Sequence, residues 1–151
     1  MGNPANLEVP AADLSSVDAV LALVREQGGR ATPARRLLLE VLFETSDHST
    51  AEDLARAVQA KVPDVHLSTI YRNLEELEGL GVVVHTHIGH GPATYHLANR
   101  THCHLVCEEC GTILDVPDDL FRSLNRATRD RFGFAIDPRH FAVLGLCQRC
   151  R

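Results

Sequence analysis

The chain has 151 residues, an apolar fraction of 44% and a net charge of −5, which argues against a general polyanion binder. No apolar run approaches the roughly 18 residues of a membrane span, and no basic segment followed by an apolar stretch opens the chain, so we expect a cytoplasmic protein. Because cytoplasmic thiols stay reduced, the five cysteines indicate metal binding rather than disulfides.

Helical spacing of apolar residues dominates the first half of the sequence. Residues 1–14, rich in Pro, Ala and Asn, predict a flexible tail. Thr32 followed by Pro33 is typical of a helix start, and Ser68 is the expected N-cap of the last helix in this half. The predicted helices cover residues 16–27, 33–43, 50–62 and 68 to Gly79 or Gly81.

Two short alternating segments, residues 82–88 and 94–98, follow the last of these helices and predict a hairpin. Three helices followed by a two-stranded hairpin indicate a winged helix-turn-helix, whose recognition helix would begin near Ser68. Without the hairpin, a helical domain with no DNA-binding role would fit equally well. We expect this domain to span residues 15–98.

The remaining residues, 99–151, predict a strand, a second strand, a helix over 117–132 and a last strand around 140–146. The whole chain is therefore predicted to be α+β, with a winged helix-turn-helix domain followed by a small α/β dimerisation domain. An exposed sheet edge in the second domain could be buried by a symmetric partner. The helix is expected to turn Leu120, Phe121, Leu124 and Ala127 inward.

The charge distribution does not by itself favour DNA binding. Residues 1–98 carry 7 basic and 13 acidic side chains, a net charge of −6, and residues 99–151 carry 8 and 7, a net charge of +1. DNA binding must therefore depend on a few well-placed arginines and helix N-termini.

Two CxxC pairs are the strongest chemical pattern. Cys107 with Cys110 and Cys147 with Cys150 each lie in a predicted loop beside a strand. Four thiolates form a closed tetrahedral Zn²⁺ site, and the two-residue spacing lets both sulfurs of a pair reach one ion. Buried or incidental cysteines are the alternative. Zinc binding would stabilise a domain whose core is small.

Histidines form the second pattern. His85 with His87, and His102 with His104, are i, i+2 pairs on predicted strands, so each pair projects to one face and could converge on a metal. Taken singly, any of these histidines is more often a surface or packing residue. Two more, His48 and His140, could complete a site from a distance.

The third pattern lies at the predicted start of the recognition helix. N-terminal residues of such a helix reach base edges, tyrosine can contact thymine methyl groups, and arginine can bond phosphate or guanine. A solvated helix start with a half-packed tyrosine is the alternative. The candidate DNA-reading residues here are Ser68, Thr69, Tyr71 and Arg72.

Together these motifs resemble the ferric uptake regulator family over nearly the whole chain. The resemblance rests on Arg30-x-Thr32-Pro33-x-Arg35, Ser68-Thr69-Ile70-Tyr71-Arg72, His102-x-His104-Leu105-Val106-Cys107-x-x-Cys110-Gly111 and the last CxxC. It implies a dimeric, metal-activated repressor of palindromic operators, with structural zinc and one or two sensing sites at the hinge between domains. It also adds Arg30 and Arg35 to the expected DNA-binding residues.

By the same resemblance, His48, His96, His102 and His104 would form the regulatory hinge site. The segments HTHIGHGPATYHLANR and GFAIDPRHFAVLG are most similar to the nickel-responsive branch, which implies a second site of His85, His87 and His140, with His96 possible in either site. The sequence departs from that branch at Thr101-His102-Cys103-His104, where the histidine-rich segment is shortened. It departs from the iron type where carboxylates are replaced by His96 and Cys103.

Other function classes fit less well. The chain lacks HExxH and the HxE with PCxxC pairing of zinc deaminases, so we expect no enzyme. A metal store would not explain the recognition helix. The open alternatives to a Ni²⁺-responsive repressor are a zinc- or iron-responsive regulator and a peroxide or redox sensor that uses the metal-site histidines and Cys103.

Overall fold

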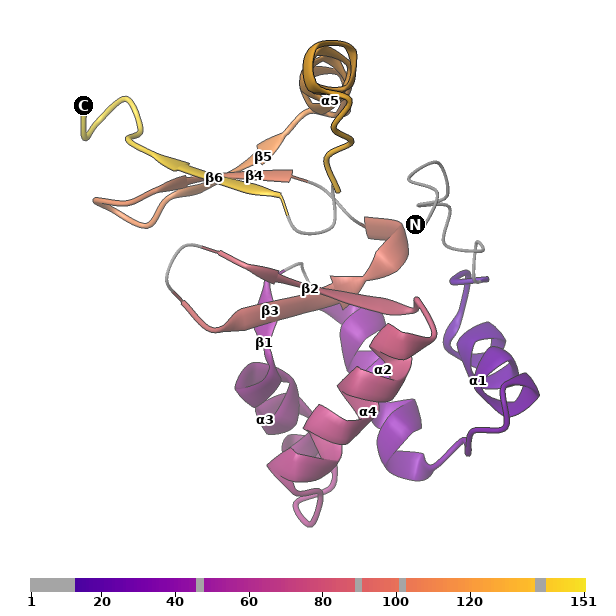
Figure 1. Cartoon of the computed structure of the whole chain (residues 1–151). Coiled ribbons are helices and arrows are strands. Elements are labelled where there is room, and N and C mark those ends of the chain that lie inside the picture. Colours follow the sequence, from indigo (N-terminus) through magenta and orange to yellow (C-terminus); the bar gives the residue numbers. More distant parts are fainter. Residues whose placement is uncertain (1–12, 46–47, 89–90, 101–102, 138–140) are drawn as a thin grey trace. The chain divides into compact units, whose positions relative to one another are not determined.

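The computed structural model describes residues 13–45, 48–88, 91–100, 103–137 and 141–151. These residues form two compact units, one within residues 8–85 and 93–100 and the other within residues 86–92 and 101–151. Helices and two small sheets make an α+β fold, which confirms the predicted class (Figure 1).

The first unit combines helices with a three-stranded sheet (Figure 1). The sheet order is β1-β3-β2, with β1 antiparallel to β3. The predicted helices and hairpin are present, and the two-residue strand β1 was not predicted. The elements are α1 (Val17–Glu26), α2 (Pro33–Glu44), β1 (Ser49–Thr50), α3 (Ala51–Lys61), α4 (Leu67–Gly79), β2 (Val83–His87) and β3 (Ala93–Leu97).

Side-chain caps explain where α2 and α3 begin. The Thr32 hydroxyl accepts from the Arg35 backbone N–H at 3.3 Å, directly before Pro33 at the first position of α2. Thr50 and Asp53 form a reciprocal capping box at the start of α3. The predicted cap of α4 was wrong, because the helix begins at Leu67 after His66, and Ser68 lies inside its first turn.

One apolar core holds the first unit together. Leu38, Leu54, Ile70, Leu74 and Leu77 are each 0% exposed and bring α2, α3 and α4 into contact. Burial of a Leu or Ile side chain contributes about 1.5–3 kcal/mol. This core fixes α4 against the other helices and leaves its opposite face in solvent.

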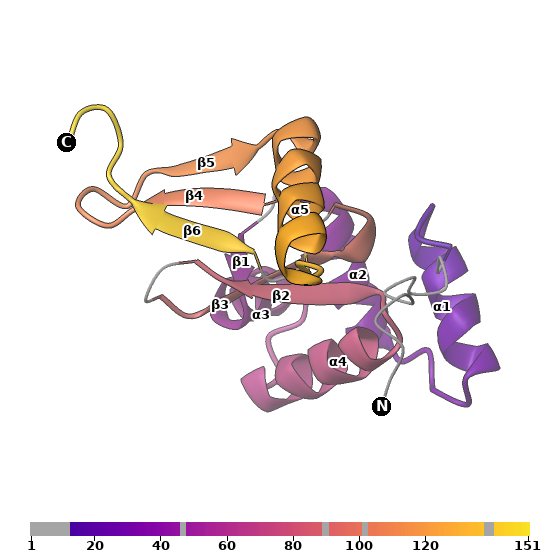
Figure 2. The same cartoon turned by 45° about the horizontal axis from the view of Figure 1, so that its top comes forward.

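The second unit is a three-stranded sheet of order β5-β4-β6 with one helix beside it (Figure 2). β4 pairs antiparallel with β5 and parallel with β6. A 3-10 turn, η1 (Ala98–Arg100), precedes this part of the chain. The elements are β4 (Cys103–Cys107), β5 (Ile113–Val116), α5 (Asp118–Phe132) and β6 (Ala142–Gly145).

The prediction that the apolar stripe of helix α5 is buried was wrong. Leu120 and Leu124 are 55% and 41% exposed, and Ala127 is exposed as well. Its contact within the unit runs through Phe121, whose ring meets that of Phe141 edge-on at 5.3 Å between centroids, and through Asn125, which accepts from the Ile136 N–H at 2.9 Å. The amphipathic stripe therefore faces outward in the single chain.

Candidate metal centre and DNA-reading surface

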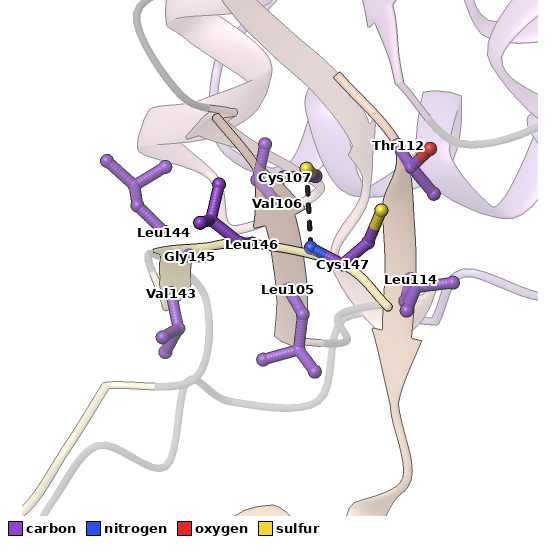
Figure 3. Close-up of a pocket in the computed structure, with 10 residues that line it drawn as sticks. All are labelled: Leu105, Val106, Cys107, Thr112, Leu114, Val143, Leu144, Gly145, Leu146 and Cys147. Carbon is purple, nitrogen blue, oxygen red and sulfur yellow. Dashed lines mark hydrogen bonds between the residues drawn. The ribbon is translucent and has the colours of Figure 1, made fainter. Parts of the chain in front are cut away.

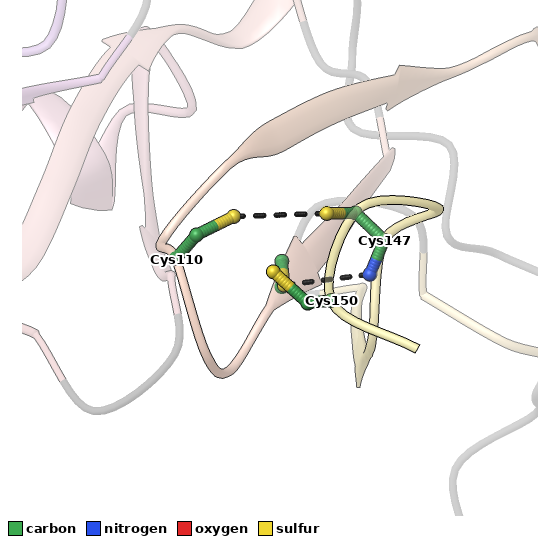
Figure 4. Close-up of side chains that lie close together, drawn as sticks. Cys110, Cys147 and Cys150 are labelled. Carbon is green, nitrogen blue, oxygen red and sulfur yellow. Dashed lines mark hydrogen bonds between the residues drawn. The ribbon is translucent and has the colours of Figure 1, made fainter.

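The two CxxC turns meet because of the sheet topology. Parallel strands β4 and β6 end at the same edge, where Cys107 is in register with Gly145. Each strand then enters a tight turn, and Gly111, with φ of 70°, adopts the left-handed conformation that returns the first turn to β5. Figure 4 shows the second CxxC pair beside Cys110.

The four sulfur atoms have the spacing of a tetrahedral metal site. All of them lie within 4.8 Å of one another, and Cys110 Sγ is 3.7 Å from Cys147 Sγ. Zn–S bonds of about 2.3 Å place tetrahedral sulfur ligands roughly 3.8 Å apart. The four predicted cysteines are thus brought together in an arrangement that fits Zn²⁺.

Hydrogen bonds tune the protonation of these thiols. The side chain and backbone of Thr112 lower the pKa of Cys110 to about 6, and the backbone N–H of Cys147, 3.4 Å from Cys107 Sγ, lowers the pKa of Cys107. The thiols of Cys147 and Cys110 raise the pKa of Cys150 to about 12. Four adjacent thiolates repel one another, so a divalent cation is what allows all of them to ionise together.

The fifth cysteine stands apart from this cluster. Cys103 is 3% exposed at the start of β4 and pairs in register with Val116 of β5. Oxidation of a thiol depends on exposure as well as on ionisation, so burial slows the reaction of Cys103 with peroxide.

A second pair of candidate metal ligands lies on the same sheet. His104 is fully buried on β4, and its Nδ1 is 3.3 Å from Oδ1 of Asp115, its register partner on β5. Asp115 was not predicted as a site residue. The antiparallel strands on either side of the CxxC turn could have identified it, because they place the two residues opposite each other.

The other predicted hinge ligands belong to the first unit or fall outside the described residues. His96 is 3% exposed on β3. His48 directly precedes β1 and has φ of 85°, a left-handed conformation that costs a non-glycine residue roughly 1–2 kcal/mol. His102 and His140 lie outside the described residues.

His85 faces a carboxylate and a tyrosine. Its Nδ1 contacts Glu78 Oε1 of α4, and its ring centroid is 6.1 Å from that of Tyr95. Successive strand residues point to opposite faces, so His96 lies on the sheet face opposite Tyr95 and His85. His87 is exposed on β2. This placement does not favour a second site that shares His96 with His85.

The candidate DNA-reading residues lie on the outer face of α4, except for Thr69. Ser68, Tyr71 and Arg72 are exposed, and Thr69 is half-buried. The Tyr71 hydroxyl donates to Glu52 Oε1 at 2.9 Å, and this bond lowers the pKa of Glu52 and raises the pKa of Tyr71. At neutral pH Glu52 is therefore a carboxylate that holds the tyrosine in place.

The two arginines expected to bind DNA differ in exposure. Arg30 is exposed in the turn between α1 and α2. Arg35 is only 5% exposed, and its guanidinium is bonded inside the first unit. The expectation that Arg35 contacts DNA is thus not met by its position, because a phosphate cannot reach a buried guanidinium that is already bonded.

The second unit exposes an unusual share of apolar surface. Of the thirteen large apolar side chains that are exposed among the described residues, ten lie in residues 105–146. A hollow of about 230 Å³ opens among the strands, and Figure 3 shows the side chains that line it. Leu114, Leu105 and Val143 form one register row across β5, β4 and β6. An apolar face of this kind indicates a protein interface.

No helix in the described ranges has the length and apolar character needed to cross a bilayer.

The chain is similar to known proteins over most of its length. The sequence pattern of the ferric uptake regulator family matches residues 26–142. The chain is 27% identical over 131 residues to the peroxide-responsive repressor PerR of Staphylococcus aureus, a match that covers 87% of this chain and 88% of the relative.

Two solved structures show the same fold. The Pseudomonas aeruginosa ferric uptake regulator with manganese has a TM-score of 0.68 and 28% identity, covering 84% of this chain and 96% of that one. The Helicobacter pylori ferric uptake regulator Fur, described as having three functional metal binding sites, has a TM-score of 0.75 at 18% identity and covers 91% and 95%.

Proposed function

Because this chain belongs to the ferric uptake regulator family, we propose that it is a metal-responsive repressor that binds palindromic operator DNA as a metal-loaded homodimer. In this proposal it acts in the cytoplasm and controls metal uptake or homeostasis. One observation carries the proposal: a tetrathiol cluster and a buried imidazole beside an exposed carboxylate occur in the same chain as a winged helix with an exposed tyrosine and arginine.

We assign structural Zn²⁺ to Cys107, Cys110, Cys147 and Cys150. Four protein ligands leave no open coordination position, so such a site holds structure and does no chemistry. The site would hold the ends of β4 and β6 together in a unit with few buried side chains.

The exposed apolar face of the second unit supports the homodimer. Two chains related by a twofold axis would cover Leu105, Leu114 and Val143 with the same residues of the partner. Dimerisation would then place two copies of α4 for the two halves of a palindromic site.

The regulatory ion is proposed to bind His104 and Asp115, with His48, His96 and His102 as further ligands. Because these histidines come from both units, an ion that needs all of them would select one arrangement of the units. The left-handed backbone of His48 supports a ligand role, since strained residues are concentrated at functional sites.

The identity of the regulatory metal is a separate proposal. The number of histidines favours nickel, and His85, His87 and His140 would be its accessory ligands. The carboxylate of Asp115 beside His104 makes a mixed oxygen and nitrogen site, which suits manganese, iron and zinc as well. Nickel remains our proposed effector, with these three metals as alternatives.

The test is a DNA-binding titration with protein purified without a tag. A duplex selected from a random pool by the metal-loaded protein should bind up to about a hundredfold more tightly with the effector than with chelator. Equal affinity in both conditions would contradict a metal-responsive repressor. Activation by iron, manganese or zinc alone would contradict only the nickel proposal.

A peroxide sensor is the second candidate, favoured by the similarity to PerR of Staphylococcus aureus. Peroxide treatment of the metal-loaded protein should then abolish binding to the selected duplex. If Cys103 is oxidised, a reductant should restore binding, and if a histidine is oxidised, binding should stay lost. Unchanged binding after treatment would exclude this function.

Replacing Tyr71 or Arg72 with alanine should weaken binding to the selected duplex while zinc content and dimer mass stay unchanged. Each side chain is exposed on α4, so its loss removes DNA contacts and no core packing. A base contact of this kind is worth about 1–3 kcal/mol. Binding by both variants at the wild-type level would show that another surface reads DNA.

A further inference from the structure

The guanidinium of Arg35 is buried in the first unit with a bond at every nitrogen. Nε donates to Asn73 Oδ1 at 2.8 Å, one terminal nitrogen donates to the backbone oxygen of Arg30 at 2.6 Å, and the other pairs with Glu76. A buried charge is tolerated only when it is paired and hydrogen-bonded. These bonds use three of the five N–H groups, and at 5% exposure the rest of the guanidinium is not open to a phosphate.

Both side-chain partners of Arg35 belong to the recognition helix. Asn73 is 6% exposed, and its Nδ2 donates to the backbone oxygen of Thr69 at 2.7 Å. Asn73 therefore links Arg35 to the first turn of α4. Thr69, Asn73 and Glu76 are spaced i, i+4 and i+7, so they follow one stripe of α4. Tyr71 lies on a different face of the helix, and Arg72 lies beside this stripe, four positions before Glu76.

The third contact ties the turn before α2 to the same guanidinium. A Cβ added at Gly29 would lie 2.7 Å from Val24 Cγ1 and 3.5 Å from a terminal nitrogen of Arg35. The α1–α2 turn is thus packed closely against Arg35, and one side chain connects this turn with α2 and α4.

From these contacts we propose that Arg35 is a positioning residue that fixes the rotation of α4 about its axis. The planar fork of arginine bonds Asn73 and Glu76 in one fixed geometry, which the flexible point charge of lysine does not reproduce. Rotation of α4 decides which edge of a base Tyr71 and Arg72 meet, so Arg35 controls sequence discrimination without touching DNA. The proposal rests on α4 being the DNA reader.

The test compares Arg35→Lys with wild type on two probes, the selected duplex and a scrambled duplex of the same composition, over a range of salt concentrations. Arg35→Lys should bind the selected duplex at least tenfold more weakly and the scrambled duplex as wild type does. The salt dependence should keep its slope. Because lysine keeps the charge and can still bond a phosphate, a phosphate-contact role would leave the two affinities near wild type or lower them alike, and either result would overturn the proposal.

Glu76→Gln provides a second test that does not depend on a buried substitution, because the Glu76 side chain is 50% exposed. Loss of an acidic charge alone strengthens binding to any DNA, and the exposed neighbour Glu75→Gln is the matched control for that effect. Relative to Glu75→Gln, Glu76→Gln should lower the ratio of selected to scrambled affinity. Equal ratios in the two variants would overturn the proposal even if Arg35→Lys fails to fold.

Failure of the proposed function can be distinguished from failure of the positioning role of Arg35. If the wild-type protein selects no duplex from the pool, the proposed function fails. If it selects one and either the Arg35 or the Glu76 variant keeps its discrimination, only the positioning role fails.

Discussion

Serine in place of Cys107 or Cys147 should remove tightly bound zinc and lower the free energy of unfolding by several kcal/mol. Each substitution removes one ligand from a cluster whose four sulfurs lie within 4.8 Å. Zinc binding to such sites contributes about 10–16 kcal/mol at neutral pH, of which part is lost with one ligand. Zinc content, denaturant unfolding and dimer mass are the measurements.

Cys103→Ser is the matched control for these variants. It changes a buried cysteine of the same sheet that lies outside the cluster, so bound zinc should be retained. Wild-type stability of the Cys107 or Cys147 variant without zinc would refute the structural site.

Glutamine in place of His104 should abolish the metal response of DNA binding while the cysteine cluster keeps its zinc. A ligand shifts an equilibrium only by its differential affinity for the two states, and a hundredfold response corresponds to about 2.7 kcal/mol of coupling. His104 is 0% exposed, so glutamine is preferred to alanine because it leaves a smaller cavity. Operator-binding isotherms with and without metal measure the effect.

Two controls accompany this variant. Its DNA affinity in chelator should equal that of the chelated wild type, which shows that the fold is intact. Asp115→Asn keeps the shape of the carboxylate but weakens its metal bond, and it should reduce the response without removing it. A full metal response in His104→Gln would exclude this residue from the switch.

Local patterns were sufficient to predict much of this fold. Apolar residues at helical spacing, together with Thr32 as a cap, identified α2, and apolar spacing identified α3. The CxxC spacing identified cysteines that the structure brings together. In each case the information lies within a few positions of the chain, where helix geometry and turn length determine the outcome.

Contacts between distant segments were beyond such reasoning. Arg35 has a basic side chain in a DNA-binding motif, and only the packing of α2 against α4 shows that it bonds Asn73 and Glu76, 38 and 41 positions away. Leu120 and Leu124 have the correct spacing for an apolar helix face. Spacing does not reveal whether the same chain or a partner covers that face.

The parallel pairing of β4 with β6 has a kinetic consequence. It joins His104 to Ala142 and Leu105 to Val143, 38 positions apart, and contacts so distant in sequence form late because the closing of a long loop is entropically unfavourable. A cation captured by both CxxC turns closes nearly the same loop before the strands pair. Scarcity of zinc should therefore slow maturation of new chains and prolong the time in which their apolar strands are open to aggregation and proteolysis.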